Sequence, residues 1–579
     1  MGKKVADQLV ETLVDAGIKR IYAVTGDSLN EVNDAVRRHK DIEWIHVRHE
    51  EAGAYAAAAE AQLNGIACCA GSSGPGHVHL INGLYDAHRT GASVLAIAST
   101  CPTYEFGTSY FQETNTIKLF EDCSGYNQIA NTPVQFSRML QAALQHTVHK
   151  KEVAIIGLPG DVAASPADAG LTSNYLLPTK SIYRPEENEL QQLAKLINSS
   201  NRITIFCGIG TKEAHEELLQ LAELIKAPIA YSFKGKMAVQ YNNPYEIGMT
   251  GLLGLPSAYA SMHESDLLIL IGTDFPYEGF MPAKNLKIVQ IDSRPERIGR
   301  RAKVDMALAG DAKDTLRNLL SYIKLKNDDS FLQKQLKRYE SVKKQLKSNA
   351  DSKGEINTIA PEYVAETIDK LADNDAIFVV DTGMCCVWGA RYLHATGERE
   401  MLGSFNHGSM ANAMPMSIGA ALARPNQQII ALCGDGGLSM LLGDLATIVQ
   451  YKLPVKLIVF ENQSLGMVKL EMEVAGLPDW QTKMYNPDFA AVAEAMGMKG
   501  FTVNDPNKLE NTLKEVFALQ EPVLVCVKTD PNALAMPPKI EFDQIKGFVT
   551  SMTKLILNGR INEVIDTAKS NMKHLGDIL

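Results

Sequence analysis

The sequence predicts an α/β protein with three doubly wound parallel-sheet domains and a C-terminal amphipathic tail. Its 579 residues exceed what one hydrophobic core supports, which favours about three domains of roughly 150–200 residues each. Short apolar runs that end in Gly, Ser or Asp alternate with helical patterns, as buried parallel strands alternate with helices. The expected strands cover residues 21–26, 66–71, 94–99, 153–157, 203–207, 267–272, 288–292, 376–381, 428–433, 455–460 and 523–527.

Two segments of different composition separate these blocks. Residues 165–184 are irregular and rich in Pro, Ser and Thr, which predicts a linker. Residues 324–355 are highly charged with a helical pattern, which predicts an exposed connecting helix followed by a linker. The expected domains are therefore 1–182, 183–345 and 346–530, with a tail over 531–579. In the tail, apolar residues recur mostly every three or four positions from Phe548 onward, which predicts one apolar helical face.

Charge and cysteine content exclude several classes of protein. A formal charge of -10 argues against nucleic acid as a partner, since binding to phosphates needs a clustered basic surface. The nine cysteines have no metal-type spacing, and neighbours such as Cys68 and Cys69 rarely bridge each other, so we expect buried thiols in a reducing compartment. The first residues lack a signal-peptide pattern, and no stretch approaches the ~20 apolar residues of a membrane span. We therefore expect a cytoplasmic protein.

A metal and phosphate site is predicted at the ends of two strands in the third block. One strand runs into Gly434-Asp435-Gly436-Gly437, and the next delivers Asn462, 27 residues after Asp435. Parallel strands joined by a helix end at the same edge of a sheet, so the two side chains should lie together. One carboxylate and one neutral oxygen suit Mg²⁺, and the glycines let the backbone approach a diphosphate. Gly-Asp-Gly alone is a common turn; the Asn that follows makes the pattern specific.

An acidic pair precedes an alanine-rich helix in the first block. Glu50 and Glu51 lead directly into residues 52–61, which are dense in alanine. A carboxylate beside so apolar a face is suited to proton exchange. From the residues alone, Glu50 could equally cap the helix, and Glu51 fits a helix N-terminal charge.

The middle block carries a weaker nucleotide signal. Gly208-Ile209-Gly210 follows a predicted strand but lacks the full GxGxxG spacing. Asp292 ends another predicted strand, where a carboxylate can accept hydrogen bonds from ribose hydroxyls. These residues alone are compatible with a domain that binds no redox cofactor.

Taken together, these motifs resemble those of the thiamine-diphosphate enzymes, and the resemblance covers essentially all of residues 1–575. It implies the thiamine-diphosphate enzyme fold, with a pyrimidine-binding domain over 1–182, an FAD-binding domain over 183–345 and a diphosphate- and Mg²⁺-binding domain over 346–530. It makes Asp435, Asn462 and the carbonyl of Ser464 the metal ligands, and Glu50 the residue that activates the aminopyrimidine ring. Met410 would support the bent cofactor.

The resemblance also implies the remaining site residues. The thiamine-diphosphate contacts would be Glu50, Gly408, Ser409, Met410, Asp435, Gly436, Gly437, Asn462, Gln463, Ser464, Leu465, Gly466, Met467 and Val468. The FAD contacts would be Gly208, Gly210, Thr250, Gly251, Leu252, Leu253, Thr273, Asp274, Phe275, Pro276, Tyr277 and Asp292. The catalytic set would be Glu50, Phe111, Gln112, Met467 and Glu471.

Within that superfamily the chain, including its tail, is most similar in pattern to the pyruvate oxidases that reduce quinone. The resemblance implies that pyruvate is oxidised to acetate and CO₂ and that two electrons pass through FAD to ubiquinone or menaquinone. It implies a tail that binds lipid at the inner face of the cell membrane, where quinone lies. It also implies at least a homodimer, and a homotetramer as the expected form, because the family pairs the first domain of one subunit with the third domain of another.

Two positions depart from the family pattern. Glu461 stands where the first of two Asn residues is usual; because side chains alternate along a strand, it should face away from Asn462. Met467 stands where these oxidases carry an aromatic residue and acetolactate synthases often carry Met, whereas Glu471 fits the oxidases. The alternatives are therefore pyruvate condensation to acetolactate, a phosphate-dependent oxidase that makes acetyl phosphate, and a non-catalytic membrane-associated flavoprotein.

Overall fold

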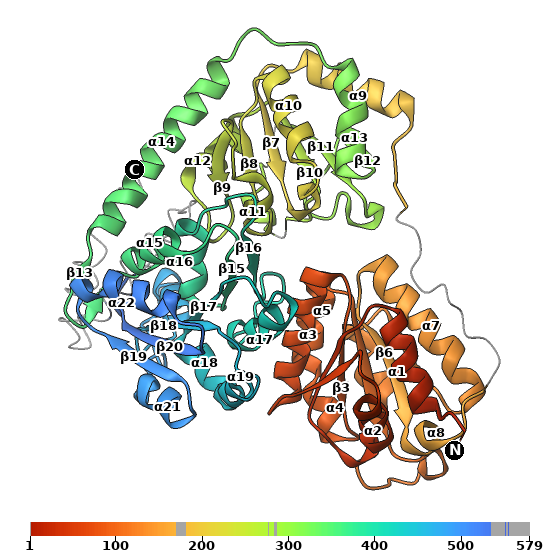
Figure 1. Cartoon of the computed structure of the whole chain (residues 1–579). Coiled ribbons are helices and arrows are strands. Elements are labelled where there is room, and N and C mark those ends of the chain that lie inside the picture. The colour runs from red at the N-terminus through yellow and green to blue at the C-terminus, as the bar shows by residue number, and fades with distance from the viewer. Residues whose placement is uncertain are drawn as a thin grey trace.

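The computed structural model describes residues 2–168, 181–275, 277–282 and 286–533, together with Ser551 and Lys554. Three six-stranded sheets, in which every strand pair is parallel, lie in order along the chain, with helices packed against them (Figure 1). The predicted class of three doubly wound parallel-sheet domains is confirmed. Most of the predicted linker and most of the predicted tail lie outside the described residues.

The first domain has the strand order β2-β1-β3-β4-β6-β5. Two hydrophobic clusters cover opposite faces of this sheet, one beneath α3 and α5 and the other beneath α1, α2 and α7. The strands are β1 (Arg20–Ala23), β2 (Glu43–His46), β3 (Ala67–Gly71), β4 (Val94–Thr100), β5 (Tyr126–Ile129) and β6 (Ala154–Pro159). The helices are α1 (Val5–Asp15), α2 (Asn30–Arg38), α3 (Glu50–Asn64), α4 (Pro75–His79), α5 (Ile81–Thr90), α6 (Thr116–Leu119), α7 (Pro133–Lys150) and α8 (Gly160–Ala164).

The middle domain has the order β12-β11-β10-β7-β8-β9. Counted from its own first strand this is the dinucleotide-binding order, which reverses direction between β7 and β10. The strands are β7 (Ile203–Cys207), β8 (Ile229–Tyr231), β9 (Glu246–Met249), β10 (Leu267–Ile271), β11 (Lys287–Asp292) and β12 (Met306–Ala309). The helices are α9 (Glu187–Ser199), α10 (His215–Ile225), α11 (Lys236–Val239), α12 (Pro256–Glu264), α13 (Ala312–Leu319) and the connecting helix α14 (Ser330–Asp351).

The third domain has the order β16-β15-β17-β18-β20-β19, which is the topology of the first domain repeated. A short antiparallel pair, β13 (Gly354–Glu355) and β14 (Thr358–Ile359), precedes it. The strands are β15 (Ile377–Val380), β16 (Glu400–Leu402), β17 (Ile429–Gly434), β18 (Lys456–Glu461), β19 (Lys499–Val503) and β20 (Val523–Lys528). The helices are α15 (Pro361–Leu371), α16 (Met384–Tyr392), α17 (Ala413–Ala423), α18 (Asp435–Met440), α19 (Leu445–Gln450), α20 (Gly466–Val474), α21 (Phe489–Ala495) and α22 (Pro506–Ala518).

Every strand expected from the apolar runs is present, with ends shifted by up to three residues. The strands without such a run are mostly at sheet edges. The edge strands β2 and β19 include exposed residues, whereas β4 and β15 are buried throughout. An edge strand covers less core, so it does not need a continuous apolar sequence.

The first and third domains pack together through α3 and α17, as Figure 1 shows. The Ala-rich face of α3 lies against Gly419 of α17, and both helices belong to one shared hydrophobic cluster. Polar contacts extend this interface: Tyr55 Oη donates to Ser409 Oγ at 2.6 Å, and Ser404 Oγ donates to the buried Asp86 at 2.7 Å.

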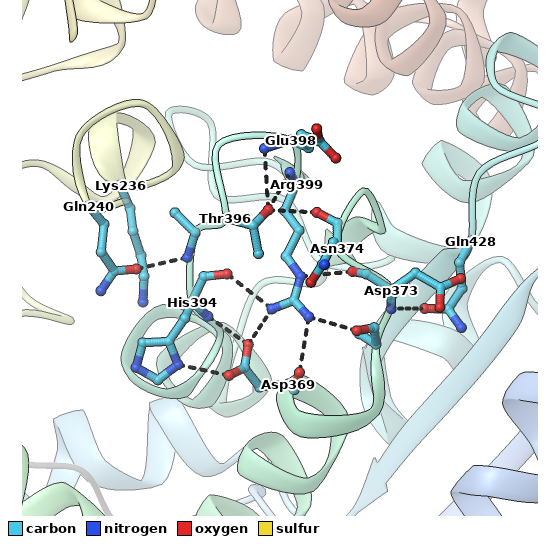
Figure 2. A network of polar contacts seen from close by, with 12 residues as sticks. Lys236, Gln240, Asp369, Asp373, Asn374, His394, Thr396, Glu398, Arg399 and Gln428 are labelled. Atoms are coloured by element: carbon cyan, nitrogen blue, oxygen red, sulfur yellow. Dashed lines mark hydrogen bonds and ion pairs between the residues drawn. The ribbon is translucent and has the colours of Figure 1, made fainter. Parts of the chain in front are cut away.

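A polar network fixes the loop between α16 and β16 in the third domain (Figure 2). The Arg399 guanidinium donates to Asp369 Oδ1 and to the carbonyl oxygens of Asp369, Ala372 and Asp373, so it satisfies the C-terminus of α15. The N–H of Ala395 donates to Gln240 Oε1 at 3.0 Å, which ties this loop to the middle domain. The network therefore holds the relative position of these two domains.

All nine cysteines are buried and free, as predicted for structural thiols. In the part of the chain that the structure describes, no helix combines the length and apolarity needed to cross a bilayer.

Candidate functional site

The strand ends predicted to carry a metal site do meet in the third domain. Asp435 begins α18 directly after β17, and Asn462 directly follows the neighbouring strand β18. Asp435 Oδ2 accepts hydrogen bonds from the backbone N–H groups of Asn462 at 3.1 Å and Gln463 at 2.7 Å. Burial raises the pKa of the Asp435 carboxyl, although hydrogen bonds, first among them that from Asn486, act to lower it. The carboxylate is thus held against the loop that carries the other candidate ligands.

The loop after β18 has a defined shape. Gln463 has a φ of 54°, and the N–H of Ser464 donates to Asn462 Oδ1 at 3.0 Å. The Ser464 hydroxyl is buried and has no hydrogen-bond partner among the described residues. A carboxylate, an amide oxygen and a backbone carbonyl form a donor set that suits a hard divalent cation.

Glycines allow close approach around Asp435. A Cβ on Gly437 would overlap the Asp381 carboxylate, which is itself buried at the end of β15. A Cβ on Gly436 would lie 3.3 Å from the Met410 methyl group and 3.0 Å from Leu465 Cδ2. Met410 and Leu465 therefore flank the start of α18, where the helix N-terminus favours an anion.

Glu50 lies elsewhere, at the start of α3. It is 6% exposed, and its Oε2 is 2.9 Å from Nδ1 of His79, whose ring stacks on that of His49. The backbone N–H of Arg48 donates to Asp444 of the third domain at 2.8 Å. This contact fixes the segment that leads into α3.

Gln112 lies beside Glu50, His79 and His49, which together form the Glu50 cluster. It has a φ of 61° and accepts a hydrogen bond from Ser73 Oγ at 3.0 Å. A Cβ on Gly74 would approach the Gln112 side chain at 2.8 Å, and one on Gly76 would lie 3.2 Å from Glu50 Oε1. The structure therefore brings Glu50 and Gln112 to one glycine-rich turn, whereas Phe111 is 74% exposed.

The candidate nucleotide residues of the middle domain meet where the strand order reverses. The N–H of Gly210 donates to the carbonyl of Gly272 at 3.0 Å, and a Cβ on Gly210 would lie 2.6 Å from the Gly272 Cα. Asp292 accepts a hydrogen bond from the N–H of Arg294 at 2.9 Å, and burial raises the pKa of its carboxyl. Thr250 is buried, and its hydroxyl has no partner among the described residues. Pro276 lies outside the described residues.

One cavity of 2340 Å³ extends over residues of all three domains, including Arg89 and His146 of the first. From the third domain, its wall contains Gly408, Met410, Asp435, Gly436, Gly437, Asn462, Ser464, Leu465, Gly466, Met467, Val468 and Glu471. From the middle domain, its wall contains Gly208, Gly210, Thr250, Gly251, Leu252, Leu253, Thr273, Asp274, Phe275, Tyr277 and Asp292. Ser409, Gln463, Glu50, Phe111 and Gln112 are not in this wall. The sequence motifs of two domains therefore face one continuous space, while the Glu50 cluster lies outside it.

Helix α20 forms part of the cavity wall through Met467 and Glu471. The turn after this helix contacts Ser551 and Lys554, two described residues of the tail. Ser551 Oγ donates to the Leu477 carbonyl at 2.9 Å, and Lys554 Nζ donates to the Gly476 carbonyl at 2.8 Å. The rest of the predicted tail helix lies outside the described residues.

Several polar residues of the site were not predicted from the sequence. His79 contacts Glu50, Asn486 Nδ2 donates to Asp435 Oδ2 at 2.8 Å, and Asn82 Nδ2 donates to Ser409 Oγ at 3.0 Å. Spacing from Glu50 along a helix could not have found His79, since it lies on α4. Asn486 lies in an irregular segment that carries no sequence signal.

Comparisons with known proteins agree with this architecture. The chain matches the thiamine pyrophosphate enzyme N-terminal TPP binding domain over residues 3–119, the central domain over 190–319 and the C-terminal TPP binding domain over 381–527. The protein YdaP of Bacillus subtilis (strain 168) is 35% identical over 573 residues, covering 98% of this chain and 99% of the relative.

Two further relatives differ in the reaction that their names give. The pyruvate oxidase of Lactiplantibacillus plantarum is 31% identical over 526 residues, covering 89% of this chain and 87% of the relative. The acetolactate synthase large subunit of Porphyra purpurea is 27% identical over 566 residues, covering 91% of this chain and 92% of the relative. The chain therefore belongs to the thiamine pyrophosphate enzyme family, with thiamine diphosphate as its cofactor.

Proposed function

We propose that this enzyme oxidises pyruvate to acetate and CO₂ and passes two electrons through FAD to a membrane quinone, ubiquinone or menaquinone. The observation that carries this proposal is one cavity that two groups of residues line together. The first group surrounds Asp435 and Asn462 in the third domain (the Asp435 loop), and the second consists of the candidate nucleotide residues of the middle domain, from Gly208 to Asp292 (the Gly208–Asp292 cluster). A flavin in the middle domain would then face the same space as the thiamine cofactor, which is the arrangement that electron transfer needs. The relative named pyruvate oxidase supports pyruvate as the substrate.

In this proposal the Asp435 carboxylate, the Asn462 amide and the Ser464 carbonyl would hold Mg²⁺, which would neutralise the charge of a bound diphosphate. Bound thiamine diphosphate supplies the carbanion chemistry of decarboxylation, and bound FAD accepts the electron pair. Glu50 would hold or release the proton that bound thiamine diphosphate requires, and His79, 2.9 Å from its Oε2, would orient the carboxylate. Gln112, Phe111, Met467 and Glu471 would line the pyruvate pocket.

The candidate site lies in two separate parts, or half-sites, one around Glu50 and one around Asp435, and this separation leads to a proposal about assembly. Glu50 and Gln112 lie outside the cavity wall that contains Asp435. Phe111 beside one half-site is 74% exposed, and Trp480, in the segment that pairs with residues 463–465, is 75% exposed. We therefore propose at least a homodimer, assembled further into a homotetramer, in which the first domain of one subunit covers the third domain of another. Glu50→Gln and Asp435→Asn chains, each inactive alone, should regain activity when mixed and reassembled.

For the tail, residues 531–579, we propose binding to the inner face of the cell membrane, so that the enzyme is cytoplasmic and peripheral. The contacts of Ser551 and Lys554 with the turn after α20 support a link between the tail and the active site. Truncation after Pro538 should abolish lipid activation and liposome binding while ferricyanide turnover persists. Undiminished liposome binding would contradict this role.

The second candidate reaction is condensation of two pyruvates to acetolactate, which Met467 and the acetolactate synthase relatives favour. A single assay separates the candidates. Under anaerobic conditions with thiamine diphosphate, Mg²⁺ and pyruvate, the flavin should become reduced, and ferricyanide or a quinone should reoxidise it. Formation of acetolactate while the flavin stays oxidised would refute the oxidase. Phosphate-dependent formation of acetyl phosphate would instead identify a phosphate-dependent pyruvate oxidase.

A further inference from the structure

Glu461 is a buried carboxylate in the residue directly before the candidate ligand Asn462. Its side chain is 2% exposed. Its Oε2 lies 2.5 Å from Lys528 Nζ and 2.6 Å from Cys526 Sγ, both on the neighbouring strand β20. Glu461 and Lys528 are also direct partners in the strand register. The Glu461 side chain therefore lies against residues of β20.

Burying a carboxylate without a partner is strongly unfavourable, so the neighbours of Glu461 decide whether a carboxylate is tolerated at this position. Lys528, whose side chain is 30% exposed, supplies the compensating charge. Burial and the nearby Glu461 raise the pKa of the Cys526 thiol, which stays protonated and donates to the carboxylate. The N–H of Thr529 donates to the Glu461 carbonyl at 2.9 Å. Side chain and backbone thus tie the end of β18 to the end of β20.

The same stretch of backbone is held from the opposite side by Asp435. The N–H groups of Asn462 and Gln463 donate to Asp435 Oδ2, and Gln463 Nε2 lies 3.5 Å from Glu461 Oε1. The loop that presents the Asn462 amide and the Ser464 carbonyl is therefore fixed between Asp435 and the Glu461–Lys528 pair. Removal of Lys528 alone would release a second carboxylate close to Asp435, where it would repel an anionic diphosphate.

We propose that Glu461 and Lys528 are a positioning pair for the metal-ligand loop. Their ion pair holds Asn462 and Ser464 in place, and its neutrality keeps the site open to the negatively charged cofactor. This inference rests on the proposed metal site at Asp435, Asn462 and Ser464, and it is independent of the pyruvate chemistry. Both residues act through the loop and touch neither substrate nor cofactor.

The test is a binding titration of the cofactor-free, full-length enzyme with thiamine diphosphate at fixed Mg²⁺, followed by Mg²⁺ at saturating thiamine diphosphate. Trp388, buried in the cavity wall, provides a fluorescence signal, and calorimetry gives an independent measurement. The variants are Lys528→Met, Glu461→Gln, the double variant and the conservative Lys528→Arg. The control is Lys499→Met, which breaks the Lys499–Glu521 pair between β19 and the segment preceding β20, whose side chains are both 47% exposed.

We expect Lys528→Met to weaken thiamine diphosphate binding by about tenfold or more, which is about 1.4 kcal/mol. The double variant should bind more tightly than Lys528→Met, because the unpaired carboxylate is gone. Lys528→Arg and Lys499→Met should stay close to wild type in affinity. Thermal melting of the cofactor-free proteins separates a general loss of stability from a loss of binding. If the pair were purely structural, both the melting temperature and the cofactor affinity would fall, in Lys528→Arg as well as in Lys528→Met.

The proposal would be overturned if Lys528→Met bound thiamine diphosphate with wild-type affinity. It would also be overturned if the loss of binding free energy in the double variant equalled the sum of the losses in the two single variants. If Lys528→Met does not fold, Glu461→Gln and the double variant decide: with the carboxylate removed, loss of Lys528 should cost little further affinity. A large additional loss would refute a role based on charge pairing. Failure of the wild-type protein to bind Mg²⁺ and thiamine diphosphate would instead refute the metal site itself.

Discussion

Gly419 of α17 lies directly on the backbone of Ala56 in α3, so closely that a Cβ on Gly419 would overlap the Ala56 carbonyl oxygen. This contact lets two helices from different domains approach each other with their backbones almost touching. The alanine-rich stretch of α3, read from the sequence as an apolar setting for Glu50, thus also forms the joint between the first and third domains.

Gly419→Ala is therefore expected to destabilise the protein. Overpacking at a tight contact typically costs about 1–3 kcal/mol, and a backbone oxygen cannot move aside as a flexible side chain can. Urea or thermal unfolding of the cofactor-free protein measures the change. Gly443→Ala is the control, because a Cβ there has no neighbour within 4 Å in the part of the chain that the structure describes. Equal stability of the two variants would contradict the tight contact.

Gly437→Ala should weaken thiamine diphosphate binding, by about tenfold or more if the turn shifts. The new Cβ would overlap the Asp381 carboxylate, which is fixed by hydrogen bonds from Thr382 and Asn412. Gly434→Ala in the same turn should cause a smaller loss, since its Cβ would meet only Cys385 Sγ at 3.9 Å. Isothermal titration with thiamine diphosphate and Mg²⁺ compares the two, and the reverse order of affinities would contradict this interpretation.

If the middle domain binds FAD as proposed, Gly210→Ala should lower the flavin content of the purified enzyme. Its Cβ would lie 2.6 Å from the Gly272 Cα and so push apart the two turns at the reversal of strand order. The flavin absorbance per chain, read after gel filtration, measures the loss. Gly279→Ala is a control in the same domain, where no atom of the described residues lies within 4 Å of the added Cβ. A full flavin content in Gly210→Ala would place the flavin elsewhere.

Asp86 should make stability fall as pH rises through the acidic range. Burial raises the pKa of its carboxyl to about 6, although the hydrogen bond from Ser404 acts to lower it. Because the folded pKa lies above the unfolded value near 3.9, the folded state binds more protons between about pH 4 and pH 6. The stability contributed at low pH is lost over that window, by about 3 kcal/mol when complete.

Asp86→Asn should remove this part of the pH dependence. Melting temperatures of wild type and variant should move apart between about pH 4 and pH 6, with the variant gaining relative stability at the higher pH. Asp41→Asn, whose side chain is 75% exposed in the wild type, is the control and should follow the wild-type curve. Parallel curves for Asp86→Asn and wild type would exclude Asp86 as the source.

Glu50→Gln should slow flavin reduction by pyruvate by about 10²–10⁴-fold, the usual contribution of a positioned acid or base. Thiamine diphosphate binding should persist, because Gln keeps the size and one hydrogen bond to His79. Stopped-flow measurement of flavin reduction gives the rate. Glu51→Gln, which alters the neighbouring carboxylate that accepts from Asn82 at 2.7 Å, should reduce the rate far less. A wild-type rate in Glu50→Gln would remove this residue from the proposed mechanism.

The sequence by itself determined the three α/β domains, because central strands of parallel sheets are buried on both faces and must be apolar throughout. It also determined that Asp435 and Asn462 meet, since neighbouring parallel strands end at one edge. The edge strands and partners such as His79 and Asn486 had no such constraint and left no pattern.

Only the tertiary structure decided which groups face one another across the domains. It joined the Asp435 loop and the Gly208–Asp292 cluster in one cavity, left Glu50 outside its wall and placed Lys528 against Glu461. These relationships arise from contacts between residues far apart in the chain, which local periodicity and spacing do not encode. The contact between Gly419 and Ala56 also joins residues far apart in the chain. Each of the two helices can be predicted from its own residues, but their close approach exists only once both domains have folded.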